Sequence, residues 1–150
     1  MLRYASTGKV GASAIRRIQE EIGGLRRPWW RGAIGLDVEE TGQPAVLSGG
    51  TALFHAQGIP DEDDLFMAFA DAAFILDRLA DWAKRFRIKW HLRMNGDDWG
   101  AIDPTGRSGP LAGQMEKWAR RARVSPAEGG AWIVDEDRRA GLLRRHAGRH

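Results

Sequence analysis

The 150-residue chain contains no cysteine, only one tyrosine and no long apolar run. Without cysteine it forms neither disulfide bridges nor cysteine-based zinc sites, and this fits a reducing compartment, so we expect a cytoplasmic location. No apolar stretch approaches the roughly 20 residues that cross a bilayer, so we expect no membrane partner. Residues 1–20 carry several basic residues and no unbroken apolar core, so we expect no secretory signal.

Signatures of catalysis and of metal binding are also missing. None of the histidines is spaced from another, or from acidic residues, as a metal site requires. The acidic run 61–64 cannot converge on one ion, because consecutive helical residues point in different directions. We therefore expect no metal, no cofactor and no catalytic residue, and rank an enzyme with an unrecognised site third among the functions considered. The histidines are His55, His91, His146 and His150.

The composition is that of an ordinary folded domain. Hydrophobic residues make up 43% and charged residues 29% of the chain, and seven tryptophans supply large anchors for a core or an interface. The length predicts a single domain, which we assign to residues 1–137. Residues 138–150 contain five arginines and no acidic residue, and we expect this tail to fray.

Residues 86–94 carry the most regular pattern in the chain. Apolar and basic residues alternate there with the period of a half-buried β-strand, which predicts the spine of the sheet. The apolar face consists of Phe86, Ile88, Trp90, Leu92 and Met94. The basic face consists of Arg87, Lys89, His91 and Arg93.

The basic face of this strand has three interpretations: a solvated surface, an interface for a protein, or an interface for a nucleic acid. Nucleic-acid binding on a sheet usually adds exposed aromatic rings for stacking. The aromatic residues Phe86 and Trp90 fall on the opposite face. A solvated surface is therefore the simplest interpretation, and a protein partner is favoured over a nucleic acid.

Asn95-Gly96 is the strongest hairpin signal and should follow the spine strand directly. A two-residue turn would place Met94 opposite Asp97, Arg93 opposite Asp98 and Leu92 opposite Trp99. We expect Arg93 and Asp98 to form an opposite-charge pair. Trp99 and Ala101 should share the buried face with the apolar residues of the spine strand.

The longest helical pattern runs from Asp61 to about residue 85. Acidic residues 61–64 suit the positive end of a helix dipole, and Asp61 is the expected N-cap. Met67 and Phe74 depart from the main apolar stripe and lie on the opposite side of the helix. We expect another element to cover them, and exposure to a partner is the alternative.

The remaining elements are less distinct, and residues 1–8 show no clear pattern. Trp29 and Trp30 are adjacent, so they are either core anchors or part of a patch that faces a partner. Gly49-Gly50 suggests a hairpin turn between two short strands. The expected elements are helices 12–25 and 110–123, a brief helix after Asp135, and strands 33–40, 45–48, 51–56 and 131–134.

Charge is segregated along the chain. Residues 33–83 hold ten acidic residues and one arginine, whereas residues 84–123 hold ten basic and four acidic residues. Such blocks either steer a charged partner or neutralise each other in the fold.

These patterns together predict an α+β domain. Its antiparallel sheet of about five or six strands packs on a long central helix, with two smaller helices. The first functional hypothesis is a non-enzymatic protein-binding protein, with a bacterial immunity or inhibitor protein that neutralises a toxin as its most concrete form. The alternative is a nucleic-acid-binding accessory protein.

Overall fold

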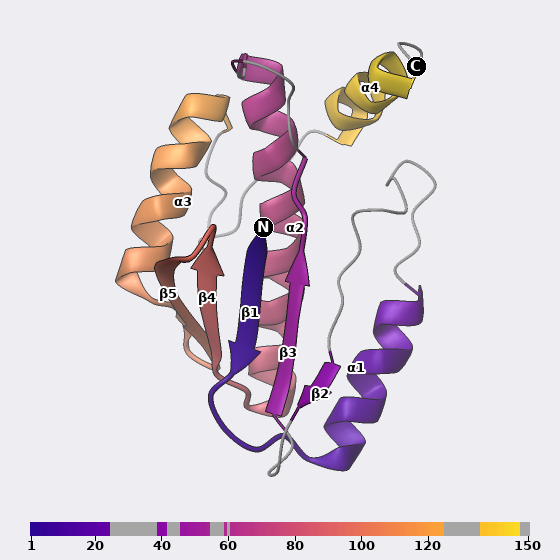
Figure 1. The fold of residues 1–150 in the computed structure, drawn as a ribbon, viewed down its shortest axis with the longest axis vertical. Coiled ribbons are helices and arrows are strands. Elements are labelled where there is room, and N and C mark those ends of the chain that lie inside the picture. The colour runs from indigo at the N-terminus through magenta and orange to yellow at the C-terminus, as the bar shows by residue number, and fades with distance from the viewer. Residues whose placement is uncertain (25–38, 42–45, 55–58, 60, 125–135, 148–150) are drawn as a thin grey trace.

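A computed structural model describes residues 1–24, 39–41, 46–54, 59, 61–124 and 136–147. It confirms the α+β class: these residues form an antiparallel sheet in the order β2-β3-β1-β4-β5-β6, accompanied by helices (Figure 1). The strands are β1 (Leu2–Ser6), β2 (Glu39–Thr41), β3 (Val46–Thr51), β4 (Trp90–Met94), β5 (Asp97–Asp103) and β6 (Gly106–Arg107). The helices are α1 (Ala12–Gly24), α2 (Glu62–Phe86), α3 (Gly109–Ala122) and α4 (Glu136–Ala147).

The central strand is β1, in a segment where the sequence suggested no structure. It lies between β3 and β4 and is antiparallel to both. The hydroxyls of Tyr4 and Thr51 hydrogen-bond at 3.1 Å, and the Ser6 hydroxyl accepts the backbone N–H of Leu47 at 2.9 Å. The local pattern gave little signal because β1 is short and both of its partners are distant in sequence.

The predicted turn at Gly49-Gly50 is wrong. Both glycines lie within β3, where Gly49 pairs with Tyr4 and Gly50 pairs with Arg3. A Cβ at Gly50 would lie 3.6 Å from the Leu2 carbonyl oxygen of β1, which is ordinary van der Waals contact. Of the predicted strands 33–40 and 131–134, only residues 39 and 40 lie within the described residues, as part of β2.

The long helix α2 begins as predicted and ends slightly later. Asp61 caps it: its carboxylate accepts the N–H of Asp64 at 2.8 Å, and Asp64 accepts the N–H of Asp61 in return. Phe86 is the last helical residue, and Arg87 closes the helix in the left-handed conformation at φ 55°. The strand predicted from residue 86 therefore pairs only from Trp90 onward, because the helical end takes up its first residues.

The hairpin between β4 and β5 forms at Asn95-Gly96, with positive φ at both residues. Met94 pairs with Asp97 and Arg93 with Asp98, as expected. The next step differs, because a β-bulge shifts the register and pairs Leu92 with Gly100 instead of Trp99. Ala101 then pairs with His91 and not with a residue of the buried face, so its predicted placement is wrong.

Helices α2 and α3 cover one face of the sheet and enclose the core. In Figure 1, α2 runs behind β1, β3 and β4, and α3 lies beside it. The α2 side of the sheet contributes Leu2, Tyr4, Trp90 and Leu92, each at most 2% exposed. Met67 is 1% exposed, so the expectation that it is covered is confirmed. None of the described helices has the length and apolar character needed to cross a membrane.

Acidic residues of the central block pair with basic residues elsewhere in the chain. Arg138 of α4 contacts Asp63 of α2 at 2.9 Å, and Arg107 contacts Asp77 of α2 at 2.5 Å. The Arg107–Asp77 pair therefore joins the acidic segment 33–83 to the basic segment 84–123. Up to residue 147 the arginine-rich tail is helical, and its Leu142 is 3% exposed within the core cluster.

Candidate functional site

The sheet face turned away from α2 is uncovered by any helix within the described residues (Figure 1). We call it the open face. Because side chains alternate along a strand, it carries the residues between the buried ones. Its central residues are Arg3 and Ala5 of β1, Ser48 and Gly50 of β3, and His91 and Arg93 of β4, with Lys89 just before β4.

The centre of the open face is a depression of about 410 Å³. Small residues line it at Ala5, Ser48 and Gly50, so little side-chain volume fills this part of the sheet. Arg3 and Arg93 border the same depression together with His91. The arrangement suits an anionic group that enters between cationic side chains and contacts the backbone-rich floor.

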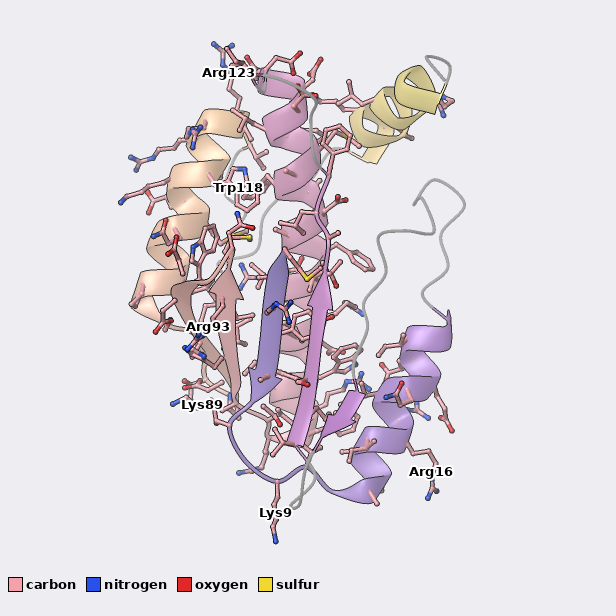
Figure 2. All side chains as sticks on the ribbon, viewed as in Figure 1. Lys9, Arg16, Lys89, Arg93, Trp118 and Arg123 are labelled. Carbon is pink, nitrogen blue, oxygen red and sulfur yellow. The ribbon has the colours of Figure 1, made fainter. Side chains whose placement is uncertain are left out.

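Two arginines stand directly opposite each other on this face. Arg3 of β1 pairs in register with Arg93 of β4. Like charges at opposed positions destabilise a sheet, and neither guanidinium has an ion-pair partner within the described residues. Figure 2 shows Arg93 and Lys89 extending from this side of the sheet. On its other side Arg93 lies opposite Asp98 of β5, whereas Arg3 lies opposite Gly50 of β3, so only Arg93 of the two has an acidic cross-strand neighbour.

His91 is held by an acidic residue of the neighbouring strand. Its Nε2 lies 3.0 Å from Oδ1 of Asp98, and the same oxygen accepts the N–H of Gly100 at 2.8 Å. The Gly100 N–H first, and the His91 contact second, hold the pKa of Asp98 below its ordinary value. The predicted Arg93–Asp98 pair is correct in register, but the Asp98 carboxylate bonds to His91 instead.

Ser48 and His91 share the open face but do not form a nucleophile–base pair. They flank Ala5 on opposite sides, so their backbones are two strand spacings, roughly 9–10 Å, apart. The structure shows no hydrogen bond between them, whereas nucleophilic catalysis requires such contact. Within the described residues, no group of three or more His, Asp and Glu side chains is placed to hold a metal ion.

The predicted partner-binding residues separate into distinct locations. Lys89, His91 and Arg93 belong to the open face, whereas the exposed Arg87 is part of the α2 cap and off the strand. Met67 is buried, and Phe74 is partly buried against the core. Trp29 and Trp30 lie outside the described residues.

No family model, curated protein or solved structure matches this chain. Arg3 is the residue of the open face that sequence reasoning missed. Its only local signal was the alternation of Leu2, Tyr4 and Ser6 around it, and its importance depends on the pairing with β4.

Proposed function

We propose that the chain is a non-enzymatic protein-binding protein that holds an acidic surface of its partner on the open face. The observation that carries the proposal is the opposed pair Arg3 and Arg93, which borders a floor of small residues. An acidic side chain of a partner would offset the repulsion between the two guanidinium groups and accept hydrogen bonds from both. A toxin-neutralising immunity or inhibitor protein is the most concrete form of this function.

A protein partner is favoured over a nucleic acid by the position of the aromatic rings. Tyr4 and Trp90 belong to the strands of the open face, yet both are buried on its other side. Stacking of bases on a sheet needs such rings on the exposed side. The cations alone would support contact with phosphates, so nucleic-acid binding is the alternative that the experiment must separate.

The test is co-expression of the full chain with the protein encoded beside its gene. We expect a complex that persists in size-exclusion chromatography, and charge reversal by Arg3→Glu with Arg93→Glu should weaken it at least about tenfold. Lys9→Glu with Arg16→Glu is the matched control, because it reverses the same number of charges at two exposed residues outside the open face.

The alternative is tested with fluorescently labelled single- and double-stranded oligonucleotides. Oligonucleotide binding that falls steeply with salt, without any protein complex, would replace the protein partner with a nucleic acid. A protein complex that the double charge reversal leaves intact would mean that the open face is not the interface.

A further inference from the structure

A groove of about 700 Å³ lies apart from the open face. It lies between α2 and α3, beyond the ends of β1 and β4, and the segment after β3 closes its far side. Figure 2 shows Trp118 of α3 at this place, between the two helices. Its volume lies within the roughly 300–1,000 Å³ range of small-molecule sites.

The floor of the groove is apolar and partly aromatic. Leu65 and Ala68 of α2, Met94 of β4 and the rings of Trp99 and Trp118 line it. The two indoles meet edge to face, with centroids 5.8 Å apart. Such a surface favours a flat apolar body, because ring contacts add to the gain from apolar burial.

One face of α3 supplies the polar rim. Gln114, Lys117, Trp118 and Arg121 all line the groove, at the i, i+3, i+4 and i+7 positions of a single helical stripe. Neither Lys117 nor Arg121 has an ion-pair partner within the described residues. The groove therefore carries two uncommitted positive charges on one wall.

The other polar groups of the groove are already engaged. The carboxylate of Asp64 accepts the N–H of Asp61 at 3.1 Å as part of the α2 capping box. The side-chain oxygen of Asn95 accepts the Met1 ammonium at 2.6 Å. The charged side chains that line the groove are Lys117 and Arg121 against the single carboxylate of Asp64, so the net charge of the lining is positive and favours an anion over a cation.

We infer that this groove binds a small amphipathic anion, with an aromatic body on the indoles and a carboxylate toward Lys117 and Arg121. The inference is independent of the proposed function, because the groove shares no lining residue with the depression on the open face. The groove would thus be a second site for a ligand of another class.

The test uses 2-naphthylacetate and its neutral counterpart 2-naphthylacetamide, titrated into the full chain by isothermal calorimetry. For a ligand of this size we expect saturable binding of the anion with a Kd on the order of 1 mM. The amide should bind roughly fivefold to tenfold more weakly, because it lacks the interaction with two partly solvated cations. Absence of saturation, or equal binding of the two probes, overturns the inference.

Two sets of variants localise the binding. Lys117→Gln with Arg121→Gln should bring the anion to the affinity of the amide, whereas Arg120→Gln, at an exposed position that does not line the groove, should change neither probe. Ala68→Trp should fill the groove and abolish binding of both probes, with Ala112→Trp on the exposed side of α3 as its control. Thermal unfolding followed by circular dichroism verifies that each variant is folded. Binding that survives Ala68→Trp places the probe elsewhere and overturns the inference.

Discussion

The two faces of the sheet differ in the residues that they carry, although the same strands form both: the α2 side is apolar and buried, and the open face is exposed and cationic at its centre. On the α2 side, Leu92 is fully buried among other apolar side chains. One residue further, Arg93 is exposed and stands opposite Arg3. Packing explains the first choice, whereas the second costs stability. The difference supports the proposal that the open face binds a partner.

Truncating one residue on each face tests this difference between the two faces most directly. Leu92→Ala should destabilise the protein by about 2–5 kcal/mol, because it leaves a cavity in the core. Arg93→Ala, its neighbour, should change the free energy of unfolding by less than about 0.5 kcal/mol. Urea denaturation measures both. An equally large loss at Arg93 would mean that the open face carries structural contacts after all.

The β-bulge in β5 determines on which face of the sheet each later residue of β5 lies. Gly100 provides the backbone conformation that the bulge requires. Gly100 has φ +103°, and a Cβ there would come within 2.3 Å of the Ser108 hydroxyl. That hydroxyl caps α3 and accepts the N–H of Ala101 at 3.0 Å. Gly100→Ala should therefore cost about 1–3 kcal/mol through strain and a disturbed cap.

Gly113→Ala is the control for the bulge variant. A Cβ at Gly113 meets nothing within 4 Å, and the residue lies inside α3. Alanine should raise stability there by up to about 1 kcal/mol, through its higher helix propensity. Thermal melts of the two variants should move in opposite directions. A neutral Gly100→Ala would show that β5 tolerates another register.

Among the residues that the structure describes, Arg85, unlike Arg3 and Arg93 of the open face, has an acidic partner within hydrogen-bond distance. Arg85 of α2 donates to the carboxylate of Glu21 on α1, and this hydrogen bond is the main cause that lowers the pKa of Glu21 from 4.5. Its stabilising effect is complete above pH 4.5 and is lost as the pH falls through the lower pKa of the folded protein.

Glu21→Gln tests this ion pair through the pH dependence of stability. The variant should be less stable than the wild type by under about 1 kcal/mol at pH 7, because the pair is partly exposed. The difference should shrink as the pH is lowered below 4.5. Urea titrations from pH 7 to about pH 3 provide the measurement. A difference that stays constant would mean that the carboxylate charge contributes nothing.

The smallest effect concerns the open face itself. A double-mutant cycle with Arg3→Gln and Arg93→Gln should give a repulsive coupling of a few tenths of a kcal/mol. Because both side chains are exposed, about 1 M salt should abolish this coupling. Attractive coupling would contradict the account of this face as an unstable pair of like charges.

Local signals predicted the parts of the fold in which neighbouring residues decide the structure. The alternation before Met94, the Asn95-Gly96 turn and the Asp61 cap all act within a few residues. Gly49-Gly50 gave the same kind of signal and was misleading, because pairing with β1 overrides a local turn preference. Propensity is a weak guide wherever distant strands determine the conformation.

The candidate sites were harder to predict for the same reason. The strand pattern identified His91 and Arg93, but Arg3 joins them only through the β1–β4 register. The residues that line the groove come from α2, from α3, from the β4–β5 hairpin and from the segment after β3. The spacing of residues within one segment cannot predict a groove whose side chains come from segments far apart in the sequence.

The central position of β1 has a consequence for biosynthesis. The strand is made before both of its neighbours, and its partners Gly50 and Arg93 follow much later in the chain. At translation rates of about 5–20 residues per second, on the order of ten seconds pass before β4 exists. Throughout that interval one edge of β1 has no partner from its own chain. The nascent protein is therefore most exposed to wrong strand pairing at the element that finally lies in the middle of its sheet.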